Sequence, residues 1–137
     1  MSDRRIFVVE DEALIAMEIQ DHLRTLGYMI AGHAARGVVA LREIPRARPD
    51  LVLMDVNLGR GPSGIEVALQ LREEIDVPVV FLTAYSDVEL AERATQTESF
   101  AYIVKPFQPQ ALRANIEMAL YKHAAERRLQ DANRRLD

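Results

Sequence analysis

Acidic side chains stand directly after two short apolar runs of this sequence. Glu10, Asp11 and Glu12 follow IFVV, and Asp55 ends LVLMD. Carboxylates gathered without partners would repel one another and raise each other's pKa, so a shared cation is expected among them. Oxygen ligands without histidine or cysteine favour Mg²⁺. These residues therefore indicate a magnesium site, provided that the fold brings them together.

A hydroxyl and an ammonium group follow two further apolar runs. Thr83 comes after VPVVFL, and Lys105 comes after FAYIV. Beside a metal ion they suit a phosphoryl group, because the cations neutralise its charge and the hydroxyl donates a hydrogen bond. Each residue alone has a plainer interpretation. An Asp or Thr after a strand often caps the next helix, and Ser86 or Asp87 could equally be the cap of the fourth helix. A Lys before Pro is usually solvated. Their joint occurrence at successive strand ends favours the phosphoryl site.

The elements that must position these residues alternate along the chain. The apolar runs predict strands at 5–9, 28–34, 51–55, 77–82 and 100–104. Amphipathic segments predict helices around 15–26 with a cap at Gly27, at 37–44 with an end at Pro45, at 64–75, at 87–97, and from near Gln108 almost to the C-terminus. Such alternation predicts a mostly parallel sheet with helices on both faces and a ligand site beyond the carboxyl ends of the strands.

Composition narrows the class of protein. The chain has 137 residues, which favours one domain, and its net charge of −4 argues against direct nucleic-acid binding. It has no cysteine, so disulfides, zinc-thiolate sites and a cysteine nucleophile are excluded. It has no apolar run long enough for a membrane span and no signal peptide, which predicts a cytoplasmic protein.

Three glycines match a nucleotide-binding pattern. Gly59, Gly61 and Gly64 have the G-x-G-x-x-G spacing of dinucleotide-binding proteins. In those proteins the glycines follow the first strand and an acid ends the next strand, whereas here they follow the third and the next ends at Leu82–Thr83. We therefore expect Gly59 and Gly61 to turn the loop after Asp55 and Gly64 to stand where a side chain does not fit.

Four segments together carry a family resemblance. FVVEDE, LVLMDVNL, FLTAYSD and AYIVKPF resemble the signature segments of receiver domains of two-component response regulators, over about residues 4–121. The resemblance implies a flavodoxin-like, doubly wound, five-stranded parallel sheet of order 2-1-3-4-5 with five helices, the last one extended.

The resemblance also implies a role for each residue of the acidic site. Asp55 accepts a phosphoryl group from a histidine kinase or phosphotransfer protein. Mg²⁺ is held by Glu10, Asp11, Asp55 and the main-chain carbonyl of Asn57. Lys105 contacts the phosphoryl group, and the peptide bond to the proline after it is cis.

Thr83 and Tyr102 match the switch pair of the family. The hydroxyl of Thr83 moves to the phosphoryl group, and the ring of Tyr102 turns inward behind it, which changes the face formed by the fourth helix, fifth strand and fifth helix. The plainer interpretation of Tyr102 is a half-buried strand aromatic.

Three departures from the family pattern are expected to have local effects. Glu10 replaces the commoner Asp, and its longer arm still reaches a metal ion. The loop after Asp55 lacks the usual Met-Pro. The segment TQTESFAY replaces a frequent Gly-Ala pair, so this turn is expected to differ.

The tail is longer than a receiver requires. We assign residues 1–121 to the receiver domain and 122–137 to a helical extension, in which Ala125, Leu129, Ala132 and Leu136 are spaced as in a coiled-coil linker. A solvated helix end is the alternative. By resemblance, such helices lead to an output domain (PAS, histidine kinase, diguanylate cyclase or RNA-binding), which would lie outside these residues. A homodimer through the switch face or through the tail is the further expectation.

Two other functions fit part of the pattern. A Mg²⁺-dependent phosphatase or phosphotransferase could use Asp55 as nucleophile, but phosphatases of the haloacid dehalogenase type carry a second Asp two residues later, where this chain has Asn57. A module that works without phosphorylation would not need to retain the acids, Thr83 and Lys105. We therefore expect no enzyme beyond the chain's own phosphorylation and dephosphorylation.

Overall fold

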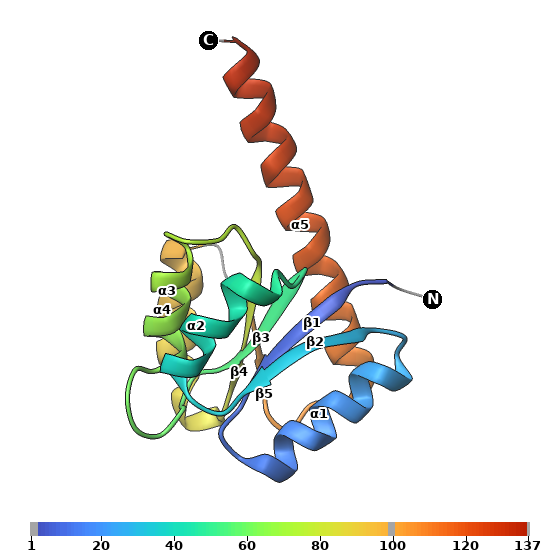
Figure 1. Cartoon of the computed structure of the whole chain (residues 1–137), viewed down its shortest axis with the longest axis vertical. Coiled ribbons are helices and arrows are strands. Elements are labelled where there is room, and N and C mark those ends of the chain that lie inside the picture. Colours follow the sequence, from blue (N-terminus) through green and yellow to red (C-terminus); the bar gives the residue numbers. More distant parts are fainter. Residues whose placement is uncertain (1–2, 99–100, 137) are drawn as a thin grey trace.

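The computed structural model describes residues 3–98 and 101–136 and shows a sheet flanked by helices, with one helix extending far beyond the body (Figure 1). Within these residues the strands are β1 (Arg5–Val9), β2 (Met29–Ala34), β3 (Leu51–Asp55), β4 (Val79–Thr83) and β5 (Ala101–Val104). The helices are α1 (Ala13–Thr25), α2 (Gly37–Ala47), α3 (Gly64–Leu71), α4 (Val88–Glu98) and α5 (Pro109–Leu136), and a 3₁₀ turn, η1 (Tyr85–Asp87), precedes α4.

The strands form one parallel sheet in the order β2-β1-β3-β4-β5. This confirms the flavodoxin-like, doubly wound fold and its predicted strand order. In the register of the sheet, Val9 pairs with Met54, Asp55 with Leu82, and Thr83 with Val104. The carboxyl ends of four strands therefore meet at one edge, where the chemistry-bearing residues follow.

The core has two layers because side chains alternate between the two faces of the sheet. Phe7 and Val9 of β1 point toward α2, α3 and α4, where the buried cluster includes Ile44 and Ala91. Ile6 and Val8 of β1 point to the opposite face, toward α1 and α5. The buried cluster on that face also includes residues of α1, β3 and α5: Ile19, Leu23, Leu53, Leu112 and Ile116. Both faces are thus covered by helices, which explains why the central strands read as unbroken apolar runs.

The second helix was predicted to end at Pro45, and this prediction is wrong. α2 runs on to Ala47 and ends at Arg48, whose backbone has a left-handed φ of 47°. A proline has no main-chain donor, so Pro45 leaves one hydrogen bond of the helix unmade, and α2 continues for two residues beyond it. Arg5 Nη1 donates to the carbonyl oxygens of Ala47 at 2.7 Å and Arg48 at 3.2 Å, which satisfies acceptors at this helix end.

Other boundaries differ by a few residues. α3 ends at Leu71 rather than at residue 75, and its last residues are replaced by a turn in which the amide of Ile75 donates to Leu71 at 2.8 Å. β4 begins at Val79, after Pro78, and includes Thr83. The predicted change in the turn TQTESFAY falls on residues 99–100, between α4 and β5, which lie outside the described residues.

Helix α5 is continuous across the boundary predicted at residue 121 (Figure 1). Its first half packs on the sheet, and Tyr28 donates a hydrogen bond to Glu117. Beyond the sheet, Asp76 in the loop before β4 contacts His123 at 2.9 Å and Arg127 at 3.5 Å. These contacts lie on one side of α5 and fix its direction relative to the domain. No helix within the described residues is both long and apolar enough to cross a membrane.

Candidate functional site

Three carboxylates meet at the carboxyl edge of the sheet. Glu10 follows β1 directly, and its amide donates to the carbonyl of Ala34 at 3.1 Å, while Asp55 is the last residue of β3. Glu10 and Asp55 are buried, Asp11 is exposed, and carboxylate oxygens of all three lie within 4.8 Å of one another. The third acid of the first run, Glu12, is not in this group; it is the N-cap residue of α1, and its amide donates to Glu10 Oε2 at 3.2 Å.

Lys105 joins two of the carboxylates. Its Nζ atom lies 2.7 Å from Glu10 Oε1 and 2.7 Å from Asp55 Oδ2. Burial opposes the charge of this ammonium, but its hydrogen bonds with Asp55 and Glu10 outweigh that effect and raise the pKa of Lys105. The lysine is therefore held in its charged form beside the acids, and the peptide bond between it and Pro106 is cis, as predicted.

Glu10 has a strongly perturbed pKa. Its side chain is fully buried, and this burial raises its pKa from 4.5 to about 7, with Lys105 lowering it and Asp55 raising it. Removal of a carboxylate from water disfavours its charged form, and a nearby negative charge adds to the effect. The cluster of three carboxylates is therefore only partly neutralised, because the ammonium of Lys105 contacts two of them.

The loop after β3 turns around Asp55. The main-chain amide of Asn57 donates to Asp55 Oδ1 at 2.9 Å, and the side-chain oxygen of Asn57 accepts from the amide of Gly59 at 3.1 Å. Gly59 and Gly61 have φ angles of 74° and 88°, in the left-handed region that favours glycine. The loop thus needs its glycines for the turn, as predicted, and places the backbone of Asn57 beside the carboxylate of Asp55.

Helix α3 begins with side-chain caps that hold this loop at its far end. Ser63 Oγ accepts from the amide of Glu66 at 3.2 Å, and Glu66 Oε1 accepts from the amide of Ser63 at 3.1 Å. This reciprocal pair is a capping box, which satisfies two amides of the first helical turn. The loop is therefore anchored by β3 on one side and by a capped helix on the other.

The two residues of the predicted switch lie on neighbouring strands in different surroundings. Thr83 is fully buried, and its hydroxyl donates to the carbonyl of Ala84 at 3.1 Å. The amide of Lys105 donates to the carbonyl of Thr83 at 2.8 Å, so these two residues are adjacent across the sheet edge. The hydroxyl of Tyr102 donates to Glu92 of α4 at 3.1 Å, and this hydrogen bond is the main cause that raises the pKa of Tyr102.

The donor set fits a hard divalent cation. Glu10, Asp11 and Asp55 offer only oxygen atoms, in a group small enough to share one ion, and their negative charge exceeds that of Lys105. Carboxylate oxygens are the ligands that Mg²⁺ prefers in proteins. The site is therefore chemically suited to this metal.

Two contacts of the site could not be found from the sequence. Glu92, the partner of Tyr102, lies on the amphipathic α4 among other charged residues, and nothing in its spacing distinguishes it. His33 Nε2 lies 3.1 Å from the carbonyl oxygen of Glu10, a contact set by the pairing of β2 with β1. Both contacts depend on side-chain placement that only the folded structure supplies.

A five-stranded parallel sheet with three acids and a lysine at its carboxyl edge defines a flavodoxin-like domain of the receiver type. The family model of the response regulator receiver domain matches residues 6–117, and the chain belongs to this family. The resemblance seen in the sequence is thereby confirmed.

Individual relatives agree with this assignment. The transcriptional regulatory protein PdtaR of Mycobacterium tuberculosis is 42% identical over 117 residues, which cover 85% of this chain and 57% of that protein. The phyllosphere-induced regulator PhyR of Methylorubrum extorquens is 35% identical over 129 residues, which cover 93% of this chain and 48% of that protein. The chain thus spans about half the length of these curated relatives.

A solved structure with a similar fold is the signal receiver domain of a modulated diguanylate cyclase from Desulfovibrio desulfuricans G20. It superposes with a TM-score of 0.83 at 34% sequence identity, covering 91% of this chain and 99% of that one. Similarity over nearly the whole of both chains supports a receiver as the structural unit.

Proposed function

We propose that this chain is a phospho-accepting receiver in which Asp55 takes a phosphoryl group from a histidine kinase or a phosphotransfer protein. The observation that carries the proposal is the environment of its carboxylate: Oδ2 accepts from Lys105 Nζ, and Oδ1 accepts from the amide of Asn57. The side chain is buried but keeps 8% of its surface exposed, whereas that of Glu10 has none. Membership of the receiver family supports the same role.

In the proposed reaction, an oxygen of Asp55 forms a bond to the phosphorus atom of the donor. The bond between phosphorus and the donor's nitrogen or oxygen breaks, and its electron pair leaves with the donor. Lys105 stays charged throughout and neutralises the transferred oxygens, because its raised pKa keeps the proton on Nζ. The chain's contribution is thus the placement of a weak nucleophile beside fixed positive charge.

Mg²⁺ is the proposed cofactor, held by Glu10, Asp11, Asp55 and the main-chain carbonyl of Asn57. When bound, this ion supplies further neutralisation of phosphoryl charge. Glu10 must be ionised to hold the ion, and its burial opposes this by raising its pKa to about 7.

The output of the proposed switch passes through Thr83 and Tyr102. A phosphoryl group on Asp55 brings new acceptor oxygens to the strand edge, and the hydroxyl of Thr83 leaves the carbonyl of Ala84 to donate to them. Tyr102 then exchanges its hydrogen bond with Glu92 for a buried position. The face formed by α4, β5 and α5 changes shape as a result, and partners read that change.

We further propose that residues 1–121 act as the receiver and that residues 122–137 act as a helical linker to an output domain. The relatives PdtaR and PhyR are about twice the length of the matched segment. The continuity of α5 through residue 121 supports a mechanical connection, since movement at the first half of a helix is carried along its axis.

The test is incubation of the chain with Mg²⁺ and acetyl phosphate, followed by intact-mass measurement and peptide mapping. We expect one phosphoryl group on Asp55, none in the presence of a chelator, and none in the Asp55→Asn variant. Asp21→Asn, on the exposed face of α1, is the matched control and should be labelled like the unmodified chain. Full labelling of Asp55→Asn, or multiple turnover on a phosphomonoester, would contradict the proposal.

A further inference from the structure

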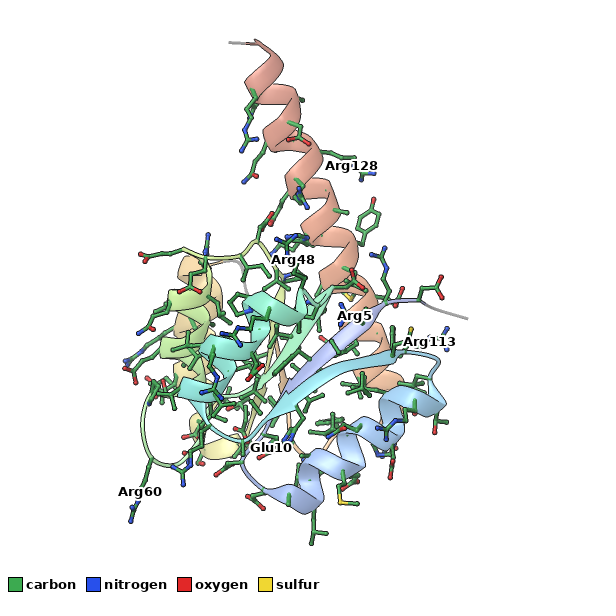
Figure 2. All side chains as sticks on the ribbon, in the orientation of Figure 1. Arg5, Glu10, Arg48, Arg60, Arg113 and Arg128 are labelled. Carbon is green, nitrogen blue, oxygen red and sulfur yellow. The ribbon has the colours of Figure 1, made fainter. Side chains whose placement is uncertain are left out.

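One carboxylate joins the loop before β4 to two successive turns of α5. Asp76 Oδ1 lies 2.9 Å from His123 Nε2, and Asp76 Oδ2 lies 3.5 Å from Arg127 Nε, one helical turn further on. We call these three residues the latch. The latch is remote from the acidic site, because Figure 2 shows Glu10 at the end of the domain opposite the projecting half of α5.

The projecting half of α5 is held to the domain by polar contacts and not by burial. Leu112 and Ile116 in the first half are buried in the core, whereas residues 126–134 are all exposed. An open groove of about 600 Å³ lies between the helix and the loop before β4. The side chains of Asp76 and Arg127 are themselves more than half exposed. Ion pairs between exposed side chains are weak, so the latch can open and close reversibly.

The latch also joins the two helical layers of the domain. The buried residues of α3 pack in the cluster on one face of the sheet, and those of α5 pack in the cluster on the other face. Asp76 follows α3 by a few residues and reaches around the edge of the sheet to α5. A movement of α3 relative to the sheet therefore changes the distances within the latch.

The segment between α3 and Asp76 is firmly built. After α3 ends at Leu71, each of the next four main-chain amides donates to a carbonyl three or four residues earlier, at 2.8 to 3.2 Å: those of Arg72, Glu73, Glu74 and Ile75. Val67, Ala68 and Leu71 are buried, which holds the helix and this turn together on the sheet. A displacement of α3 is thus passed on to Asp76 and is not absorbed by a slack loop.

The other end of α3 begins at the acidic site. A Cβ atom on Gly64, the first residue of α3, would collide with the main-chain carbonyl of Asp55. The amide of Asn57 donates to Asp55 Oδ1, and the capping box of Ser63 and Glu66 fixes the far end of the same loop to α3. A phosphoryl group on Asp55 changes the acceptor that the Asn57 amide meets. The loop and the start of α3 must then adjust together.

We propose that phosphorylation of Asp55 is transmitted through α3 to the latch and releases the projecting half of α5. The Arg127 contact of 3.5 Å is at the limit of a hydrogen bond, so a small displacement of Asp76 breaks it. The inference rests on the proposed receiver function and adds a second output to it, separate from the face formed by α4, β5 and α5.

Release of the latch allows the projecting half of α5 to tilt about the packed half. Leu120 packs against the core cluster, and Ala132 lies twelve residues further along the helix. Twelve helical residues span about 18 Å, so a tilt of about 10° moves Ala132 by about 3 Å. Whatever follows the helix in a longer chain is then presented at a different angle.

Distance measurements between two spin labels test the latch. The chain has no native cysteine, so labels on Thr25→Cys, at the exposed end of α1, and on Ala132→Cys report the direction of α5. Dilution with unlabelled chain restricts the signal to distances within one molecule. We expect a narrow distance distribution that shifts or broadens by about 3 Å in Asp76→Ala.

The controls separate the latch from a general effect of charge. Glu74→Ala removes an exposed acid from the same turn and should leave the distances unchanged. His123→Ala combined with Arg127→Ala removes the contacts from the helix side and should reproduce the change in Asp76→Ala. Equal distances in Asp76→Ala and the unmodified chain would overturn the latch.

Phosphorylation tests the route. After incubation with Mg²⁺ and acetyl phosphate, intact mass identifies the labelled chain, and its distances should move to those of Asp76→Ala. Labelled Asp76→Ala should show no further change, and labelled Thr83→Ala should still respond, because the route through α3 does not use the switch pair.

Two results would overturn the route alone. One is a labelled chain that keeps the distances of the unlabelled chain, and the other is a response that disappears in labelled Thr83→Ala. A chain that does not become labelled at Asp55 would overturn the proposed receiver function as well, so the two failures are distinguishable by mass.

Discussion

Gly64 lies directly against the main-chain carbonyl of Asp55, so closely that a Cβ atom on Gly64 would stand 1.9 Å from that oxygen. The amide of Gly64 also donates to the carbonyl of Val56 at 2.9 Å. The first residue of α3 therefore packs on the backbone that carries the proposed phosphoryl acceptor. Because the obstacle is backbone and not a flexible side chain, the position admits no larger residue without a shift of β3 or α3.

Gly64→Ala should destabilise the fold and disturb the site together. The added methyl group must push the end of β3 away from α3, and overpacking of this kind costs about 1–3 kcal/mol in the free energy of unfolding. Denaturant titration measures the loss, and acetyl phosphate labelling measures the accompanying fall in the rate at Asp55.

Gly61→Ala is the matched control. An added Cβ atom there meets nothing within 4 Å, but the φ angle of 88° is unfavourable for alanine. We expect a cost of about 1 kcal/mol from the backbone alone and little change in labelling. Equal effects of the two substitutions on labelling would show that close packing at Gly64 is not what positions Asp55.

Lys105→Met should separate metal binding from phosphoryl transfer. The substitution leaves Glu10 and Asp55 without the ammonium that lies 2.7 Å from each, so the metal-free protein loses stability. The carboxylates then attract a cation more strongly, and we expect Mg²⁺ affinity to rise several-fold while labelling of Asp55 falls by at least about tenfold.

Isothermal titration with Mg²⁺ and timed labelling provide the two readouts for this variant. Lys122→Met, on the exposed part of α5, removes the same group far from the acids and should change neither. Weaker Mg²⁺ binding in Lys105→Met would mean that the lysine organises the metal ligands and does not compete with the ion.

Mg²⁺ binding should depend on pH through Glu10. Its pKa of about 7 in the folded protein lies above the ordinary 4.5, so between these values the metal-free folded protein keeps a proton that the unfolded chain has released. The contribution of Glu10 to stability is therefore present at low pH and declines as pH rises toward 7. A bound metal ion must displace this proton, so Mg²⁺ affinity should rise up to about tenfold per pH unit below 7 and level off above it.

Thermal unfolding with and without Mg²⁺ across this range follows both effects. The Glu10→Gln variant cannot release the proton and should show weaker binding with a flatter pH dependence. Mg²⁺ affinity that stays constant between pH 5.5 and 7 in the unmodified chain would contradict this role of Glu10.

The fold was accessible from the sequence because its strands are buried on both faces. Runs such as LVLMD have no polar interruption, and helices of the right length separate them, so a parallel sheet was the remaining solution. The boundaries were less accessible. Pro45 was expected to end α2, yet it lies within the last turn, where Arg5 from a distant strand supplies donors to the helix end.

The candidate site was predictable where residues follow strands and unpredictable where long side chains meet. Glu10, Asp55, Thr83 and Lys105 come together because strand order alone places them at one edge. The contact of Tyr102 with Glu92 depends instead on the rotation of α4 about its axis, which the sequence does not fix to within one side chain. Likewise, the coiled-coil spacing in the tail was visible in the sequence, but the orientation of α5 follows from its core packing and from its contacts with Asp76. The side chain of Leu136, which completed the predicted repeat, lies outside the described residues.

Thr83→Ala should uncouple phosphorylation from the proposed switch. The buried hydroxyl is the group expected to move to the phosphoryl oxygens, and without it nothing draws the strand edge toward Asp55. We expect acetyl phosphate to label Asp55 within several-fold of the normal rate, because Lys105 and the loop remain in place. The ring signals of Tyr102 in NMR spectra should shift on phosphorylation of the unmodified chain, as its hydrogen bond with Glu92 breaks, and should shift little in Thr83→Ala. Thr83→Ser keeps the hydroxyl and should restore the shift. A full shift of Tyr102 in labelled Thr83→Ala would show that the two residues are not coupled.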